Sequence, residues 1–296
     1  MDTLSSAKGD RLFHIVNNAV LGLFLIIVLY PLLYVLSASF SSSSAVISGK
    51  VWLWPVDFSL EGYQAVFRHR MVWTGFQNTI IYTALGTIVS LFVTILAAYP
   101  LSRSDFKGRR AFTLLFVFTM MFNGGLIPSY LLVRELGMLD TIWAMVVPTA
   151  LSVWNVMIMM TYFRTSIPKE LLESAQMDGC NDFKFLLRIV LPLSGPIIAV
   201  ITLFYGVDQW NQYFNALIFL KKEKLFPLQL VLRDILIQNQ VSQETLGDVQ
   251  TAAARQGLRE LLKYSLIVVS SAPLLAAYPF VQKYFVKGIM IGSIKG

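Results

Sequence analysis

The sequence is poor in charge, in cysteine and in histidine. Charged residues make up 14% of the 296 positions, whereas an ordinary soluble domain carries about 25%. The single thiol, Cys180, cannot form an internal disulfide, and the only histidines, His14 and His69, lie far apart and in no His-Glu-x-x-His arrangement. No Gly-x-x-x-x-Gly-Lys-Ser/Thr phosphate loop occurs, so the chain should not bind ATP in that manner. We therefore expect no catalytic residues, no metal site and no cofactor in the chain itself.

Apolar sequence is what the chain has in excess. Hydrophobic residues make up 56% of it, and its mean hydropathy is +0.63. Several apolar stretches run for about 20 residues, the length that a helix rising about 1.5 Å per residue needs to cross a hydrocarbon core of roughly 30 Å. We predict an all-α, multi-pass membrane protein with six transmembrane helices in a single domain over residues 1–296, at roughly 13–38, 76–100, 110–134, 139–162, 194–220 and 262–286.

The first apolar stretch also has features of a signal peptide. Basic residues precede it, and Ser37-Ala38-Ser39 resembles a signal-peptidase site. The stretch from Ile15 to Ala38 is longer than the apolar region of a signal peptide, which has about 7–15 residues. This length favours a retained first span.

Basic residues set the expected orientation. The short loop from Arg103 to Arg110 is dense in positive charge, and cytoplasmic loops carry the excess of lysine and arginine. With that loop inside, six spans put both termini in the cytoplasm. The net charge of +7 is spread between apolar runs and is not gathered in a patch with aromatic residues, so we expect no nucleic-acid partner.

The most informative stretch, residues 163–192, lies between the fourth and fifth predicted spans. It is too polar to cross a membrane and too regularly patterned for a loop. Pro168 suits the first turn of a helix that runs to about Met177, Asp178-Gly179 is a turn pair, and Asn181 or Asp182 suits the N-cap of a second helix. Pro192 ends the apolar face of that second helix, formed by Phe183, Leu186, Leu187 and Val190. We predict two short helices joined at a sharp turn on the cytoplasmic side.

Six residues of this segment share a fixed spacing: Glu173, Ala175, Gly179, Ile189, Leu191 and Pro192. The spacing resembles the EAA motif of ABC importer permeases, in which Glu-Ala-Ala is followed after three residues by Gly and after nine more by Ile-x-Leu-Pro. Ser174 is the one departure, where the family usually has Ala. In that family the segment is a coupling helix that docks on the ATP-binding subunit, and the resemblance implies that role here, with Asp178 in the turn. An interfacial helix lying on lipid is the alternative for such an amphipathic segment.

The resemblance covers essentially the whole chain and is strongest to the second, maltose-type permease subunit of carbohydrate importers, in their complex-polysaccharide branch. Softer matches are the Asn123–Pro128 and Trp210–Asn215 stretches and the end of the chain. The resemblance implies the type I ABC importer permease fold, an oligosaccharide cargo and a place in the bacterial cytoplasmic membrane. It also implies a second permease subunit from a different chain, two ATP-binding subunits that hold ATP and magnesium, and an extracytoplasmic solute-binding protein.

The glycine-punctuated C-terminal tail is a further expected contact. In the maltose-type subunit the tail reaches between the two ATPase subunits. The resemblance implies the same contact for Gly288, Gly292, Lys295 and Gly296. A frayed end is the alternative.

Asp208 is an ionisable residue inside a predicted span, and such residues are functional candidates because charge is costly in lipid. Amides and aromatic rings around it offer the hydrogen bonds and flat apolar faces that a sugar requires. We predict a substrate pathway that includes Asp208, Gln209, Trp210, Asn211, Tyr213, Asn215 and Asn123. The sequence leaves open an equal alternative, that these polar residues hold helices together.

An ATP-independent secondary transporter of a polar solute is the alternative function. Such a protein would show repeated halves, or chains of intramembrane carboxylates and histidines, and the sequence has neither. A purely structural membrane partner would leave the 163–192 segment unexplained. We therefore predict a permease subunit that is not itself an enzyme and depends on ATP hydrolysis in a partner.

Overall fold

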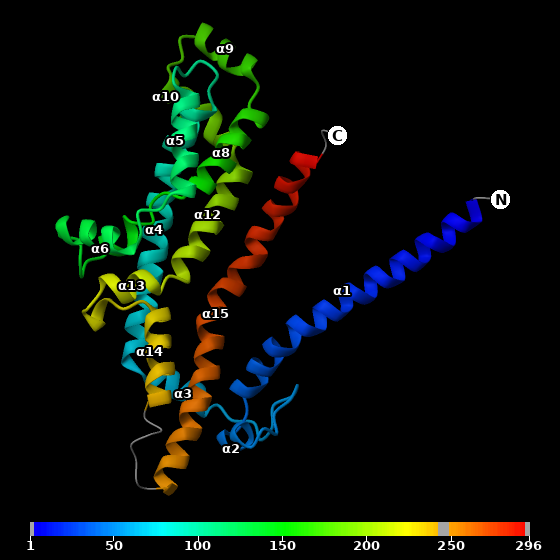
Figure 1. The fold of residues 1–296 in the computed structure, drawn as a ribbon, viewed down its shortest axis with the longest axis vertical. Helices are drawn as coiled ribbons and strands as arrows, with labels where there is room; N and C mark the ends of the chain where they lie inside the picture. Colours follow the sequence, from blue (N-terminus) through cyan, green and yellow to red (C-terminus); the bar gives the residue numbers. More distant parts are fainter. Residues whose placement is uncertain (1–2, 242–248, 294–296) are drawn as a thin grey trace. The chain divides into compact units, whose positions relative to one another are not determined.

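The computed structural model describes residues 3–241 and 249–293, and every regular element in these residues is helical (Figure 1). The α-helices are α1 (Thr3–Ser39), α2 (Ser43–Ile47), α3 (Glu61–Arg68), α4 (Arg70–Ser102), α5 (Arg109–Met121), α6 (Leu126–Glu135), α7 (Trp143–Val146), α8 (Val153–Ser166), α9 (Lys169–Met177), α10 (Asp182–Phe185), α11 (Leu191–Leu193), α12 (Gly195–Trp210), α13 (Phe214–Phe219), α14 (Leu228–Val241) and α15 (Val249–Ser293). A π-helical turn, η1 (Leu186–Val190), and a 3₁₀ turn, η2 (Glu223–Leu225), complete the elements. The all-α prediction is confirmed for these residues.

The chain folds into two compact units, and the first contains residues up to Arg70 together with Leu232–Ala272. Its core joins the end of α1, α2 and α15 through the buried side chains of Ala38, Val46 and Leu261. α3 approaches α15 closely at Gly62, where an added Cβ would lie 3.0 Å from the backbone oxygen of Leu261. A glycine is required at this crossing because any side chain would collide with α15.

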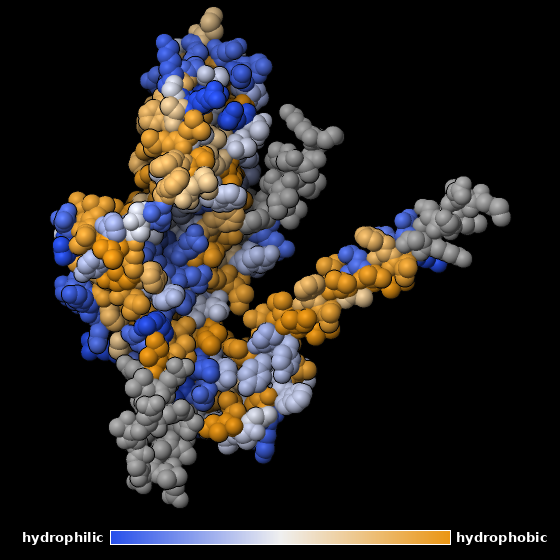
Figure 2. Space-filling view, in the orientation of Figure 1, coloured by the Kyte–Doolittle hydropathy of each residue, from blue (hydrophilic) through white to orange (hydrophobic). Residues whose placement is uncertain are grey.

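The second unit contains Met71–Val231 together with the residues from Pro273 onward. In it α8 contacts both α5 and α12. A core of buried side chains from α4, α8 and α12 includes Ala98, Met159, Phe163, Ile201 and Tyr205. α9 and α10 lie at one end of this group of helices (Figure 1), and the surface at that end is predominantly hydrophilic (Figure 2). The predicted coupling segment thus forms a polar end on an apolar helical body.

Three helical stretches are long and apolar enough to cross a membrane: Asp10–Ser39, Arg70–Ser102 and Gly257–Pro279. The predicted intervals 13–38, 76–100 and 262–286 lie within α1, α4 and α15, which contain these stretches. In α1 none of the most apolar window is buried, and its surface is a continuous apolar band (Figure 2). An apolar surface of that length needs lipid or another protein around it.

The other three predicted spans are not single continuous helices. The interval 110–134 holds α5 and α6, which are bent by 112°. Gly125 there adopts φ +90°, and its N–H donates to Asn123 Oδ1 at 2.9 Å, so the break follows from local turn chemistry.

The interval 139–162 holds α7 and α8, separated by residues 147–152, and the interval 194–220 holds α12 and α13, separated by residues 211–213. A hydropathy window sums side chains and does not detect bends in the backbone. A second bent pair joins Asp182–Leu193 to α12 at 83°. Counting this pair and the pair of α5 and α6 as one span each gives up to five candidate spans in the described residues. The six-span count therefore remains a prediction.

Candidate functional site

The 163–192 segment folds locally as the sequence predicts. α9 begins after Pro168 and ends at Met177. Gly179 then adopts φ +73°, a left-handed conformation that favours glycine, and its N–H donates to Gln176 O at 3.0 Å. The Cys180 N–H donates to Ala175 O at 2.9 Å. These bonds close the turn back onto α9 and fix the direction in which the chain leaves it.

The second helix begins as expected but does not end at Pro192. Asn181 Oδ1 accepts the Lys184 N–H at 2.8 Å, which caps α10. The helix then widens into η1, where the Leu191 N–H donates to Leu186 O, five residues earlier. Pro192, which has no N–H, follows directly and lies within α11. Helical structure therefore continues past Pro192, the residue at which the predicted apolar pattern ends, and the π-helical turn before it accommodates the proline ring.

The apolar face of the second helix also differs from the prediction. Phe185, Leu186 and Val190 are buried and pack into the core with α4 and α8. Phe183 and Leu187, predicted on the same face, are 65% and 47% exposed. Met177, at the end of α9, is 89% exposed. We call the exposed side chains of Met177, Phe183 and Leu187 the apolar tip; they extend from an end of the molecule that is otherwise polar.

Some residues of the EAA-like motif are buried or partly buried against the helix core, and the others are exposed. Ala175 is the buried residue of α9, and Ile189 and Leu191 are partly buried and pack against the same core. The remaining residues are exposed: Glu173, Ser174, Asp178, Gly179 and Pro192. Ser174 Oγ donates to Glu170 O at 2.8 Å and so serves its own helix. Apart from Ala175, the first half of the motif is thus exposed on α9 and on the turn that follows it.

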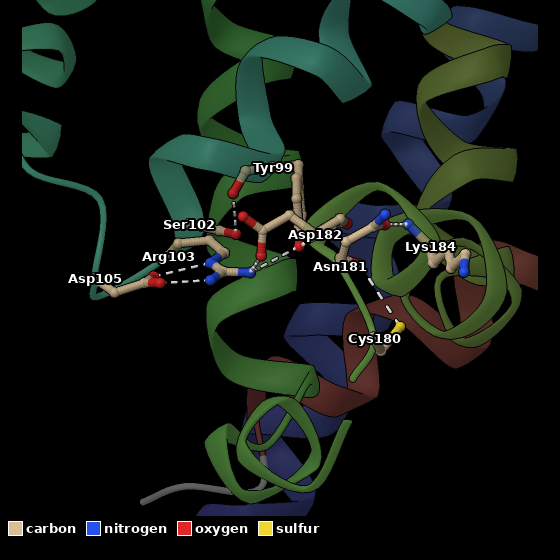
Figure 3. A network of polar contacts seen from close by, with 8 residues as sticks. All are labelled: Tyr99, Ser102, Arg103, Asp105, Cys180, Asn181, Asp182 and Lys184. Carbon is tan, nitrogen blue, oxygen red and sulfur yellow. Dashed lines mark hydrogen bonds and ion pairs between the residues drawn. The ribbon is translucent and has the colours of Figure 1, made fainter. Parts of the chain in front are cut away.

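Arg103, just beyond α4, ties this segment to the body (Figure 3). Its Nη1 donates to Asp182 Oδ1 at 2.8 Å and to the Tyr99 hydroxyl at 3.0 Å. Its other nitrogens form a bidentate pair with Asp105, with Nε donating to Oδ1 at 2.8 Å. The Arg103 side chain is only 9% exposed, whereas that of Asp182 is 70% exposed. One guanidinium therefore joins the end of α4, the loop after it and the start of α10.

The pair between Arg103 and Asp105 shifts both groups toward their charged forms. The hydrogen bond from the guanidinium lowers the pKa of the Asp105 carboxyl, and the bond to Asp105 raises the pKa of Arg103. Both stay ionised at neutral pH. The sequence does not predict this network, because it shows Arg103 only as one of several basic residues in a short loop.

The predicted pathway residues differ in their burial and in their contacts. Gln209 and Trp210 are buried. Gln209 Nε2 donates to Thr149 Oγ1 at 2.9 Å, and the Trp210 ring lies edge-on to Phe76 with centroids 5.8 Å apart. Asn211 Nδ2 donates to Val207 O at 2.9 Å within its own helix. Gln209 and Trp210 thus contact other helices of this chain, and Asn211 bonds within its own helix; a place for the three residues in the pathway stays a prediction.

The other predicted pathway residues are accessible or serve turns. Asp208 is exposed and lines a cavity of about 390 Å³ together with Trp154 and Asn155. Tyr213 is exposed and Asn215 half-buried beside it. Asn123 supports the turn between α5 and α6. Asp208 is thus a member of the predicted set that lines a cavity.

A buried hydroxyl pair near this cavity was not predicted from the sequence. Thr94 Oγ1 and the Tyr205 hydroxyl are 2.6 Å apart, and the Ser152 N–H donates to the same hydroxyl at 3.1 Å. This contact fixes the start of α8 against α4 and α12. A tyrosine within an apolar run was the available signal, since a buried tyrosine hydroxyl usually has a partner.

The C-terminal contact lies largely beyond what the structure describes. Lys295 and Gly296 fall outside the described residues, and Gly288 and Gly292 lie in the last part of α15. Among the described residues no group of three or more histidine, cysteine, aspartate or glutamate side chains could hold a metal ion.

Comparison with known proteins gives a consistent family. Residues 90–291 match the family described as "Binding-protein-dependent transport system inner membrane component". "Polygalacturonan/rhamnogalacturonan transport system permease protein YtcP" of Bacillus subtilis (strain 168) is 41% identical over 97% of this chain and 99% of its own length. "Protein LplC" of the same organism is 39% identical over 99% of this chain and 98% of its own.

A solved structure extends the likeness to three dimensions. The structure titled "Crystal structure of a bacterial ABC transporter involved in the import of the acidic polysaccharide alginate" contains a chain that is 38% identical and matches with a TM-score of 0.84. The match covers 94% of this chain and 98% of that chain. The chain therefore belongs to the family of binding-protein-dependent transport system inner membrane components.

Proposed function

We propose that this chain is a transmembrane permease subunit of an ABC importer that moves an oligosaccharide across the cytoplasmic membrane. The observation that carries the proposal is the apolar tip of Met177, Phe183 and Leu187, held outward by the buried anchors Phe185 and Val190. Exposed apolar side chains on a polar end call for a partner. A groove on an ATP-binding subunit would bury them in the helix-in-groove mode.

The energy for transport comes from the partners. Two ATPase subunits bind ATP and magnesium, and this chain contributes neither a catalytic residue nor a cofactor. Their closure moves the coupling segments of two different permease subunits and switches the pathway from inward-facing to outward-facing, where an extracytoplasmic binding protein delivers the cargo. ATP must bind the closed state preferentially, because a ligand with equal affinity for two states shifts neither. The tail residues Gly288, Gly292, Lys295 and Gly296 add a second contact with the ATPases.

The topology we propose has six spans and both termini in the cytoplasm of a bacterial cell. Basic side chains support the orientation: a cavity of about 330 Å³ beside the coupling segment is lined by Arg103, Arg109, Arg164 and Lys169. Such residues gather on the cytoplasmic side of membrane proteins. The interval 139–162, in which α7 and α8 are separated, is the one predicted span that the five candidates do not include.

An oligosaccharide cargo is supported by the names of the relatives. They include permeases named for polygalacturonan and rhamnogalacturonan and for arabinooligosaccharides, and the structural neighbour belongs to an alginate importer. The cavity at Asp208 offers an aromatic face in Trp154 and an amide in Asn155, and this chain can therefore contribute to the sugar pathway.

The test is ATPase activity of the copurified importer, with and without loaded binding protein, for wild type and Gly179→Asp. Gly137→Asp is the matched control, since Gly137 also has a left-handed φ of +67° and no heavy atom within 4 Å of an added Cβ, but lies outside the coupling segment. Only Gly179→Asp should lose ATPase assembly or stimulation while the permease still folds. If no ATPase copurifies and Gly179→Asp leaves transport unchanged, an ATP-independent transporter becomes the better reading.

A further inference from the structure

The cavity at Asp208 lies between the start of α8 and the outer half of α12. Trp154, Asn155 and Ser152 line it from α8 and its N-cap, and Phe204, Val207 and Asp208 line it from α12. Its volume of about 390 Å³ is at the lower end of small-molecule sites, which range over about 300–1,000 Å³. Trp154 is 60% exposed, so one face of its indole is free to contact a ligand.

The depth of the cavity follows from helix geometry. Asp208 lies near the C-terminal end of α12, which starts at Gly195 beside the coupling segment. At about 1.5 Å per residue this position is about 20 Å from that end. Trp154 lies about 18 Å from the end of α8 by the same measure. With the start of α12 at the cytoplasmic boundary of a hydrocarbon core of roughly 30 Å, as in the proposed topology, the cavity would lie just past the middle, the level at which transporters built from interrupted helices hold their cargo.

The charge in this cavity has one sign. Asp208 is the only charged side chain that lines it in the described part of the chain, and no described residue forms an ion pair with this carboxylate. A carboxylate at this depth is costly against lipid, so it must face a polar pathway or a partner. A sugar hydroxyl donates readily to a carboxylate, whereas a second carboxylate brought beside it is repelled.

We propose that the cavity beside Asp208 binds a neutral sugar ring of the cargo and discriminates against uronate rings. The ring stacks on Trp154, donates hydroxyl hydrogen bonds to Asp208 and reaches the Asn155 amide. The inference rests on the proposed function and deepens it. Polygalacturonan and alginate, named for two similar proteins, are acidic polymers, whereas the negative charge in this cavity opposes an acidic ring.

The experiment uses the complete importer in proteoliposomes and a matched pair of sugars. Galactotriose and trigalacturonate share ring and linkage and differ by a carboxylate on each ring. Affinity of the binding protein for each sugar is measured separately, and uptake is compared at saturating loaded binding protein, so that the ratio of rates reports the permease step. The variants are Asp208→Asn and the control Glu135→Gln, which removes an exposed carboxylate outside the cavity.

The proposal expects wild type to prefer galactotriose and Asp208→Asn to raise the uptake ratio of trigalacturonate to galactotriose about tenfold, as loss of a like charge predicts. Glu135→Gln should leave the ratio unchanged. Trp154→Ala should lower galactotriose uptake while loaded binding protein still stimulates the ATPase.

Three results would overturn the inference. One is a binding protein that captures only trigalacturonate, and another is equal uptake of both sugars by wild type. The third is an uptake ratio unaffected by Asp208→Asn, which would mean that a cation of the partner permease neutralises the carboxylate. Failure of the proposed function looks different, because loaded binding protein would then not stimulate any ATPase.

Discussion

The bond between Arg103 and Asp182 joins two residues that are 79 positions apart in the sequence. We predict that breaking it lowers both the stability of the fold and the coupling to the ATPase. We consider Asp182→Asn, which removes the charge but keeps the shape, and Arg103→Gln, which removes the guanidinium. Asp105→Asn is the matched control. It takes away the other carboxylate on the same guanidinium but leaves the link to the coupling segment in place.

The magnitude follows from burial. Ion pairs between exposed side chains contribute about 0.2–1 kcal/mol, since water screens them. The Asp182 side chain is 70% exposed but that of Arg103 only 9%, which puts the pair at the upper end, about 1 kcal/mol. Arg103→Gln also loses Asp105 and Tyr99 as partners, and we expect it to lower the free energy of unfolding by about 2–3 kcal/mol. A double-mutant cycle should return a coupling of about 1 kcal/mol for Arg103 with Asp182.

The functional assay is stimulation of the ATPase by loaded binding protein in the assembled complex. If the pair holds the coupling segment against α4, Asp182→Asn should lower stimulation by about fivefold, the factor that corresponds to about 1 kcal/mol. Asp105→Asn should have a smaller effect on stimulation. Equal losses of stimulation in Asp105→Asn and Asp182→Asn, or a coupling energy near zero in the cycle, would refute the reasoning.

The remaining predictions concern local packing and charge. Gly62→Ala should lower the free energy of unfolding by about 1–3 kcal/mol, because the new Cβ meets α15, whereas Gly124→Ala, with open space around it, should cost much less; thermal unfolding of the two variants checks this. The lowered pKa of Asp105 stabilises the fold above the unfolded pKa of about 3.9, and this contribution should be lost as the pH falls below that value; a pH titration of stability should show this loss in wild type and not in Arg103→Gln. Tyr205→Phe removes a buried hydroxyl that bonds α4 and the start of α8, and denaturant unfolding should show a loss of about 1–2 kcal/mol.

Local turn and capping chemistry was sufficient to predict much of the backbone of the coupling segment. The turn at Gly179 and the cap at Asn181 depend on neighbouring residues alone, so the sequence predicts both, and the structure agrees. The buried face of the second helix could not be predicted in the same way. The buried residues Phe185, Leu186 and Val190 themselves recur at helical spacing, and a period of 3.6 residues does not choose between this face and the overlapping apolar face that holds Phe183 and Leu187.

Contacts between residues far apart in the sequence also could not be predicted. The Arg103 network and the pair between Thr94 and Tyr205 join side chains from distant segments, and a single sequence contains no signal of their distance. The sequence left the pathway residues with two equal alternatives. The structure adds their burial, with Gln209 and Trp210 packed inside the helix group and Asp208 at a cavity, and the pathway itself stays a prediction.

The sequence by itself determined the all-α class, three long apolar helices and the family-like coupling segment, because run length, turn residues and motif spacing are local properties. Only the tertiary structure decided where apolar stretches break, at residues 122–125, 147–152 and 211–213, and which side chains point outward as the apolar tip. The physical reason is that burial depends on neighbours brought together by folding, which a hydropathy sum over consecutive residues does not contain. Such a sum also misses backbone geometry, even where the bend is local, as at Gly125.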